Sequence, residues 1–395
     1  AALIAEMGHR PKLAREHFTK ANSTTSLNQR IVLAFGKFEE RQGNPGRARE
    51  LYNNYLKRVR HPLITNAVRN IGLKKPEPLI STAREGLAEA FYDIATQLSV
   101  GSVSDLSVLY IRMALYLRPE FPLAQLLLAD VHERHKKPLK AIASYNKVPE
   151  SSPLRLEADV QAALNLDEIG ESARAQRLLK RIIARYPREL RPVEALANML
   201  RGRKKYKEAI PYYTRAIRLV GKPETRHWAF FYSRGICYER TGQWPKAEKD
   251  LLKALELSPE RPVVLNYLGY SWVERRRNLK KAMGMIRLAV NLRPNDGYII
   301  DSLGWAHYRL GEWSEAVKKL ERAVELQPED PIINDHLGDA YWRAGRRLEA
   351  RFQWSHALAF KPEPENLILI RKKLEAGLPP LEGRRKANRS PSKIR

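Results

Sequence analysis

Small and apolar residues recur along the chain with a period of 34 residues, and within each period they fall three or four residues apart. The last two periods contain the matched series Leu303, Gly304, Gly311, Ala316, Leu320, Ala323, Pro328 and Leu337, Gly338, Gly345, Ala350, Trp354, Ala357, Pro362. Such spacing places apolar side chains on one face of an α-helix. Because glycine breaks the pattern midway and proline ends it, each period predicts two helices joined by a turn.

The series continues towards the amino terminus. The two preceding periods contain Gly269, Ala282, Ile286, Ala289, Pro294 and Gly235, Gly242, Ala247, Leu251, Ala254, Pro259. Four earlier periods keep a shorter series, with Ala209, Tyr213, Ala216; Ala175, Leu179, Ile182, Pro187; Ala141, Tyr145, Val148, Pro153; and Ile111, Ala114, Pro119. A further period contains Gly36, Gly43, Ala48 and Tyr52, and the first residues match the second half of another, with Ala14, Phe18 and Ala21.

This pattern resembles the tetratricopeptide repeat, a helix-turn-helix unit of the same length. The resemblance covers about residues 1 to 362. It implies an all-α fold, an α-solenoid in which the hairpins stack into a right-handed superhelix. Small residues at repeat positions 8, 20 and 27 let the two helices approach closely, and bulky residues at positions 4, 7, 11 and 24 fill the space between them.

Departures from the period predict the domain organisation. Residues 1–62 form amino-terminal repeats, the first of them truncated, so that the natural chain is expected to extend upstream. Residues 63–87 break the period around an extended Lys-Lys-Pro-Glu-Pro centre and are either a tolerated insertion or a hinge. Residues 88–362 form the main solenoid. We expect a capping helix at 363–378, with Arg371, Lys372 and Lys373 facing water. We expect a disordered basic tail at 379–395.

The net charge bears on the possible binding partners, and the cysteine content bears on the cellular compartment. The chain has 71 Lys and Arg against 44 Asp and Glu, a formal charge of +27, which attracts nucleic acid, anionic lipid or acidic proteins without selecting among them. With one cysteine, Cys237, neither an intrachain disulfide nor a thiolate zinc cluster can form, which fits a cytosolic or a periplasmic protein. No apolar run reaches the roughly 18 residues that a membrane span needs.

Catalytic and metal-binding motifs are not found in the sequence. It contains no phosphate-binding glycine loop, no GxSxG and no HExxH. His132 and His135 could share a metal with Glu133, but His132 falls at a core position of the repeat, so a structural role is favoured. Cys237 is expected to be a buried thiol. We therefore predict no enzyme activity, no cofactor and no metal.

The predicted binding surface is the concave inside of the superhelix. In the tetratricopeptide family, positions 2, 5, 9 and 12 of the first helix line it. Here they select Tyr232, Asn266, Tyr270, Tyr298, Asp301, Trp305, Tyr308, Asp335, Asp339 and Trp342. Aromatic side chains bury large apolar areas with little loss of rotamer freedom, and Asn or Asp can bind the backbone of an extended peptide. The alternative for any single ring is that it packs against neighbouring helices.

Three functions are consistent with the sequence. Residues from about Pro262 to Pro380 resemble bacterial exported repeat proteins, some of them tethered to the outer membrane, that act as adaptors for a periplasmic carboxyl-terminal processing protease. This resemblance implies a non-catalytic scaffold in the periplasm that binds a protein or peptide in its groove; a cytoplasmic protein is the alternative. The second function is polyanion binding, to nucleic acid or anionic lipid, through the basic outer faces; no nucleic-acid motif supports it. The third is an enzyme whose catalytic domain precedes Ala1.

Overall fold

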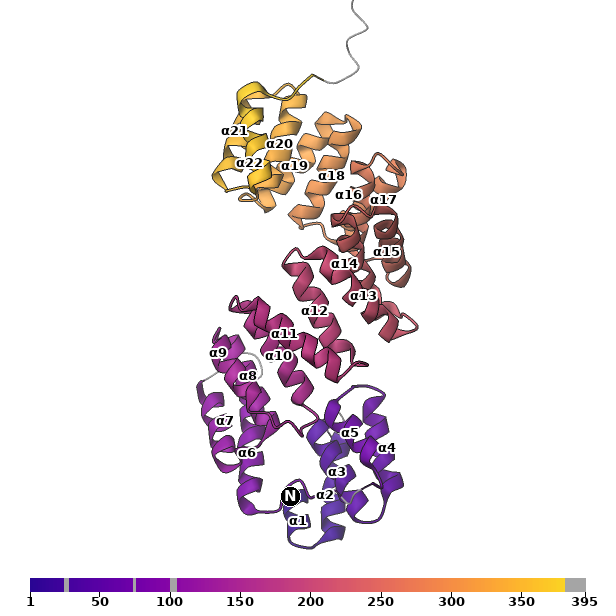
Figure 1. Ribbon diagram of the computed structural model, residues 1–395, viewed down its shortest axis with the longest axis vertical. Helices are drawn as coiled ribbons and strands as arrows, with labels where there is room; N and C mark the ends of the chain where they lie inside the picture. Colours follow the sequence, from indigo (N-terminus) through magenta and orange to yellow (C-terminus); the bar gives the residue numbers. More distant parts are fainter. Residues whose placement is uncertain (25–27, 74–75, 100–104, 381–395) are drawn as a thin grey trace, which may run out of the picture. The chain divides into compact units, whose positions relative to one another are not determined.

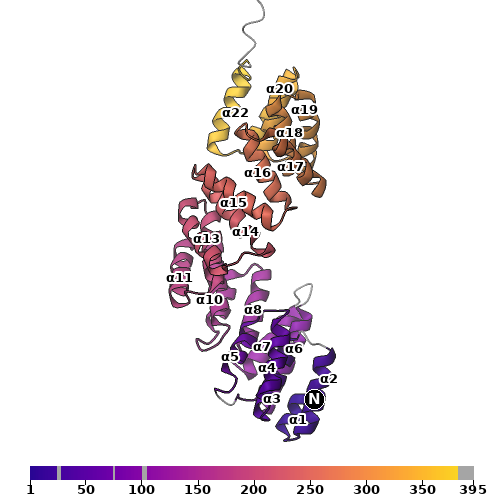
Figure 2. The ribbon, with the colours of Figure 1, turned by 90° about the vertical axis from the view of Figure 1, so that its right-hand side faces the viewer.

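The computed structural model describes residues 1–24, 28–73, 76–99 and 105–380. They form 22 α-helices and one short 3-10 helix, and the described residues contain no strand, which confirms the all-α repeat fold (Figure 1 and Figure 2). The chain divides into two compact units, Ala1–Lys204 and Lys205–Arg395, which are described separately. The predicted basic tail beyond residue 380 lies outside the described residues.

The first unit contains twelve α-helices among its described residues. In chain order they are α1 (Ala2–Met7), α2 (Pro11–Thr24), α3 (Gln29–Arg41), α4 (Pro45–Leu56), α5 (Pro62–Asn70), α6 (Ala83–Leu98), α7 (Asp105–Leu117), α8 (Pro122–Arg134), α9 (Pro138–Asn146), α10 (Arg155–Glu168), α11 (Ser172–Arg185) and α12 (Leu190–Gly202). Consecutive helices pack in pairs from α1 and α2 to α10 and α11, with α5 as an additional helix.

Helix α5 lies inside the segment expected to be an insertion or hinge. It packs against α3 and α4, and Ile64 is fully buried there. The next helix, α6, begins before that segment ends, because Thr82 and Glu85 form a capping box at its start. The break in the repeat period therefore contains ordered helix, although residues 74 and 75 at its centre lie outside the described residues.

The second unit contains ten α-helices among its described residues. They are α13 (Tyr206–Val220), α14 (Trp228–Arg240), α15 (Trp244–Leu257), α16 (Pro262–Glu274), α17 (Leu279–Leu292), α18 (Gly297–Leu310), α19 (Trp313–Leu326), α20 (Pro331–Arg343), α21 (Arg347–Ala359) and α22 (Pro364–Ala376), with the short 3-10 helix Thr225–His227 before α14. Helices α14 to α21 form four packed pairs, and α22 packs against α21 within the range predicted for a capping helix.

Close contact between the two helices of a pair explains the small residue at repeat position 8. A Cβ atom on Gly338 of α20 would lie 2.5 Å from the Trp354 ring of α21 and 3.1 Å from the Ala350 carbonyl oxygen. In the preceding pair, a Cβ on Gly304 would lie 2.6 Å from Leu320. Trp354 and Leu320 are fully buried, so neither can move aside without cost.

The turns inside the pairs use left-handed backbone. Gly311 has φ of +81° and Gly345 has φ of +87°, a region that glycine enters without the steric penalty of a Cβ atom. At the corresponding turn between α8 and α9, Lys136 adopts φ of +56° instead. The turn geometry is therefore kept even where the glycine of the repeat pattern is missing.

Substitution of Gly338 by Ala should destabilise the second unit by about 1–3 kcal/mol, because the added methyl group overfills the contact with Trp354. The control is Gly284→Ala in the middle of α17, where an added Cβ has no neighbour within 4 Å. That change should stabilise the protein by about 0.5–1 kcal/mol. Chemical denaturation followed by the helical circular dichroism signal measures both. Equal effects at the two positions would contradict the packing explanation.

Candidate functional site

The ten residues selected from the sequence lie on the first helices of four successive pairs in the second unit. Tyr232 lies on α14; Asn266 and Tyr270 lie on α16; Tyr298, Asp301, Trp305 and Tyr308 lie on α18; and Asp335, Asp339 and Trp342 lie on α20. Spacings of three and four residues place those of one helix on one face. Contacts link the members on α18 and α20 to their neighbours, as the next paragraphs describe.

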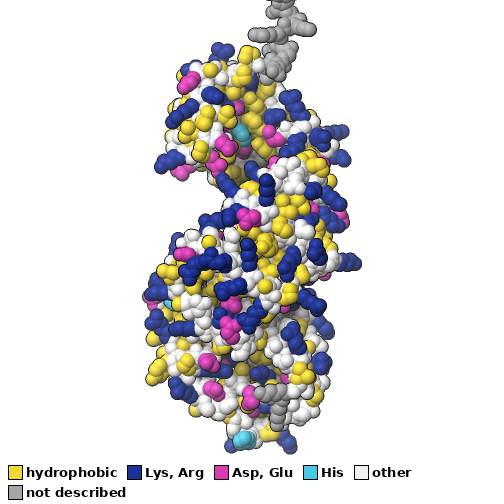
Figure 3. All heavy atoms as spheres, in the orientation of Figure 1, with side chains coloured by type: hydrophobic (Ala, Val, Ile, Leu, Met, Phe, Trp, Pro, Cys, Tyr) yellow, Lys and Arg dark blue, Asp and Glu magenta, His cyan; other side chains and the backbone are white. Residues whose placement is uncertain are grey.

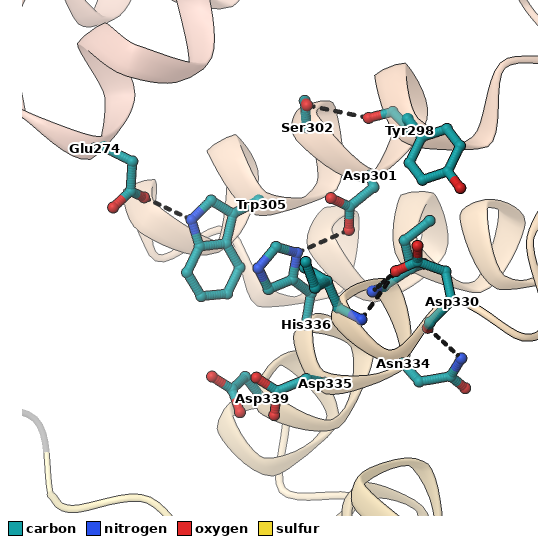
Figure 4. A network of polar contacts seen from close by, with 12 residues as sticks. Glu274, Tyr298, Asp301, Ser302, Trp305, Asp330, Asn334, Asp335, His336 and Asp339 are labelled. Atoms are coloured by element: carbon teal, nitrogen blue, oxygen red, sulfur yellow. Dashed lines mark hydrogen bonds and ion pairs between the residues drawn. The ribbon is translucent and has the colours of Figure 1, made fainter. Parts of the chain in front are cut away.

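Trp305 is held on three sides. Its ring stacks on His336 of α20, with ring centroids 4.0 Å apart, and on Tyr308, with centroids 4.6 Å apart. The indole Nε1 donates a hydrogen bond of 2.6 Å to Glu274 at the end of α16, a carboxylate that also accepts from Arg309 at 3.1 Å. Figure 4 shows the indole between Glu274 and His336. The ring is therefore half-buried and fixed in orientation.

Asp301 is paired with His336. The two side chains are buried, and Nδ1 of His336 donates to Oδ1 of Asp301 at 2.8 Å (Figure 4). Burial by itself lowers the pKa of His336, but the Asp301 carboxylate, helped by Asp335 and Asp339, more than offsets this, so the pKa is raised above its ordinary value. Asp301 was expected to be open to a peptide; in the structure, its carboxylate already has a partner.

Asp335 and Asp339 are paired with the capping helix. Nζ of Lys373 on α22 donates to both carboxylate oxygens of Asp335 at 2.8 Å and to Asp339 at 2.9 Å. Asp339 also accepts from Nε1 of Trp354 at 3.0 Å. Burial lowers the pKa of Lys373, but the two carboxylates outweigh it and the pKa is raised. The expectation that Lys373 faces water is therefore wrong, because two carboxylates of α20 bind its ammonium group.

Trp342 is covered by the end of the same helix. Its ring lies 5.4 Å from that of Trp354, and a Cβ on Gly377 would come within 2.0 Å of it. The Arg347 guanidinium lies 5.3 Å from the ring centroid. The expectation that Trp342 and Asp339 stand open in a hollow is thus wrong, since α22 and the residues after it occupy that position. A binding role for either residue stays a prediction.

The accessible part of the selected set lies on α16 and α18. Tyr298 is 55% exposed and borders a hollow of about 480 Å³ before α18. Asn266 donates from Nδ2 to Ser302 at 3.1 Å, while its buried Oδ1 has no partner within the described part of the chain. Burial, with Glu274 and Asp301 nearby, raises the pKa of half-buried Tyr270, so its hydroxyl stays protonated. Tyr232 contacts Tyr267 edge-on, with centroids 5.9 Å apart.

Three residues of the network were not selected from the sequence: His336, Glu274 and Arg309. Glu274 precedes Trp305 by 31 residues, and His336 follows Asp301 by 35. A search for complementary side chains about one repeat length apart would have found both pairs. In the space-filling view, Lys and Arg side chains cover much of the visible surface, and Asp and Glu side chains are scattered among them (Figure 3).

The histidine and cysteine residues considered for chemistry have structural positions. Cys237 is fully buried and His132 is buried on α8, whereas His135, at the end of α8, is half-buried. Within the described residues, no group of three His, Cys, Asp or Glu side chains is placed to bind a metal ion. None of the described helices combines the length and apolar character needed to cross a membrane.

Comparison with known families identifies the repeat. A family model described as TPR repeat matches residues 304–345, and two described as tetratricopeptide repeat match residues 228–261 and 160–223. The TPR repeat-containing protein PA4667 of Pseudomonas aeruginosa is 33% identical over 91 residues. That match covers 23% of this chain and 15% of the relative, so the chain spans a small part of the relative's length.

Among solved structures, a tetratricopeptide repeat protein supports the fold. A tetratricopeptide repeat protein from Parabacteroides merdae superposes with a TM-score of 0.51 at 15% identity, covering 64% of this chain and 96% of its own. YrrB, described as a TPR protein with an unusual peptide-binding site, has a TM-score of 0.37 at 21% identity, covering 49% of this chain and 97% of its own. At these identities the likeness concerns the fold alone.

Loss of the Lys373 contact should weaken the end of the second unit. Lys373→Met leaves Asp335 and Asp339 without their cation, and breaking a buried ion pair on one side costs on the order of 3 kcal/mol. The control is Lys372→Met, because Lys372 is the preceding, exposed residue of α22. Hydrogen exchange of α22 amides and chemical denaturation measure the effect. Equal destabilisation by the two variants would show that the pairing contributes little.

The Asp301–His336 pair should make stability depend on pH. The pKa of His336 is raised in the folded protein. The pair therefore stabilises the fold fully below the unfolded-state pKa of about 6.5, and this stabilisation is lost as the pH rises through the folded-state pKa. The difference in unfolding free energy between the wild type and His336→Asn should therefore shrink with rising pH. Denaturation between about pH 5 and pH 9 measures it. A constant difference over that range would contradict the pairing.

Proposed function

Because this chain is built of tetratricopeptide repeats, we propose that it is a non-catalytic scaffold that binds a protein or peptide segment across α16 and α18 of its second unit. Tetratricopeptide proteins bind protein or peptide partners. The observation that carries the proposal is the row of partly accessible rings that Tyr270 on α16 and Tyr298 and Trp305 on α18 present, next to the hydrogen bond between Asn266 and Ser302 that joins these two helices. The partly accessible rings would pack against apolar side chains of an extended peptide.

The fixed orientation of Trp305 favours binding. A partner that covers this ring does not have to immobilise it, because Glu274 and His336 already hold it. Rigid aromatic side chains with one polar end are the residues that contribute most to binding energy in interfaces. Preorganisation of this kind lowers the entropic cost of association.

The charges around the site favour an apolar segment over a basic one. Asp301, Glu274 and Asp335 are already paired with His336, Arg309 and Lys373. A cationic ligand would have to compete with these internal partners, whereas an apolar side chain can pack on the rings without breaking an ion pair. The expected ligand is thus an extended segment with apolar side chains and free backbone amides.

A finer proposal concerns the partner and the compartment. The resemblance of residues Pro262 to Pro380 to exported bacterial adaptors supports a periplasmic role, associated with the outer membrane, in which the chain recruits a carboxyl-terminal processing protease. Immobilised chain should then retain the purified protease from the same organism. Failure of the immobilised chain to retain the protease would remove this assignment and leave the more general one in place.

The binding face is tested with the double variant Tyr270→Ala and Tyr298→Ala. Peptides enriched on the wild-type chain from a random library should bind the variant at least about tenfold more weakly, because two aromatic contacts are lost. Fluorescence anisotropy of a labelled peptide measures the Kd, and circular dichroism checks the helical content. The control is Phe352→Ala on α21, where the ring is 60% exposed, close to the 55% of Tyr298. An unchanged Kd for the double variant would contradict the proposal.

A further inference from the structure

A separate hollow lies on the first unit, between α7, α8 and α9. It has a volume of about 700 Å³, and its lining includes Arg112 and Tyr116 from α7, Gln125 and His132 from α8, and Lys140 from α9. All of these elements belong to the first unit, so the hollow is distinct from the face on α16 and α18. Neither the proposed peptide-binding function nor the repeat core requires a polar hollow here.

The floor of this hollow carries two buried polar side chains with unsatisfied atoms. Gln125 is 4% exposed and His132 is 8% exposed. Oε1 of Gln125 and Nδ1 of His132 have no hydrogen-bond partner among the described residues. A buried polar atom without a partner costs about 1–3 kcal/mol. Oε1 of Gln125 accepts and needs a donor such as water, whereas Nδ1 of His132 can donate to an anion in one tautomer.

The walls of the hollow are positively charged. Arg112 projects from α7, Lys140 projects from α9, and Lys147 directly follows α9. None of the three forms an ion pair with a carboxylate within the described ranges, and the acidic side chain that the lining includes is the exposed Glu120. An uncompensated group of three cations around buried polar atoms favours an anionic ligand.

An apolar ridge adjoins the hollow on the outer face of α7. Leu106, Leu109, Met113 and Tyr116 are exposed and follow one another at spacings of three and four residues, on the side of the helix opposite the buried Ile111. Tyr116 belongs to both features, because it lines the hollow and is 79% exposed. A ridge of this kind is unusual on the surface of a soluble repeat and marks an interaction surface.

We propose that this face of the first unit docks on a membrane surface that contains anionic phospholipid. The ridge enters the interfacial region of the bilayer, and the hollow receives a headgroup phosphate between Arg112, Lys140 and Lys147. Exposed apolar side chains combined with flanking cations are what binds a helix to an anionic lipid surface. The charge of +27 supports approach to such a surface.

Bound phosphate should change the titration of His132. Burial lowers its pKa, and the positive charges of Lys140, Arg112, Lys137 and His135 lower it further. A phosphate in the hollow neutralises part of that charge, so the pKa of His132 should rise when the site is filled. NMR titration of the His132 ring with soluble short-chain phosphatidylglycerol measures this shift. The same titration with inorganic phosphate distinguishes a site for free phosphate from one that requires lipid.

Vesicle sedimentation tests the docking surface on the full chain. The wild type should bind vesicles containing phosphatidylglycerol and should not bind pure phosphatidylcholine vesicles. The triple variant Arg112→Gln, Lys140→Gln and Lys147→Gln should bind on the order of a hundredfold more weakly, because each cation near an anionic membrane contributes about 1 kcal/mol to the binding free energy. The matched control, Arg277→Gln, Lys280→Gln and Lys281→Gln in the second unit, removes as many exposed charges and should bind like the wild type.

Three further outcomes decide the assignment. Leu109→Ser with Met113→Ser should abolish vesicle binding while the phosphatidylglycerol-induced pKa shift of His132 remains, because the ridge is lost and the hollow is kept. Equal weakening by the two triple variants would overturn the proposal, since binding would then follow total charge only. Absence of binding to anionic vesicles would also overturn it and leave an acidic protein segment as the ligand of this face. Circular dichroism of each variant checks that it is folded.

Discussion

The close contact between the two helices of each pair determines the rest of the structure. Gly304 against Leu320 and Gly338 against Trp354 bring the helix axes near enough that no larger residue fits at the glycine. Gly36, Gly235 and Gly269 make the same kind of contact in other pairs. Successive first helices, such as α16, α18 and α20, also contact one another. Residues about one repeat length apart therefore meet, as Trp305 and His336 do, and a surface forms from side chains that are distant in the sequence.

The sequence predicts the helix pairs because their chemistry is local and periodic. Glycine, alanine and proline at fixed offsets mark the contact, the turn and the end of each pair, and the positions that face one side follow from the register. Helix α5 escaped prediction because its apolar residues, such as Ile64, do not follow the repeat. The partners of Asp301, Asp335 and Asp339 also escaped, because pairing across helices depends on the rotamers of His336 and Lys373 and on the position of α22.

The two units differ in how their charges are compensated. On α16, α18 and α20 the carboxylates are paired internally, which leaves aromatic rings as the available contacts. Around the hollow of α7 to α9, three cations and two buried polar atoms remain uncompensated among the described residues. One chain of similar repeats thus presents two surfaces of different chemistry. This difference arises from side chains outside the repeat pattern, which the fold leaves free to vary.

The position of Lys373 on the last described helix also has a kinetic consequence. In a linear array each repeat touches only its neighbours, so structure is lost from the ends inward and fraying starts at the outermost helix. A cation that ties α22 to two carboxylates of α20 slows this first step. Local unfolding of this part of the second unit therefore depends in part on a single ammonium group.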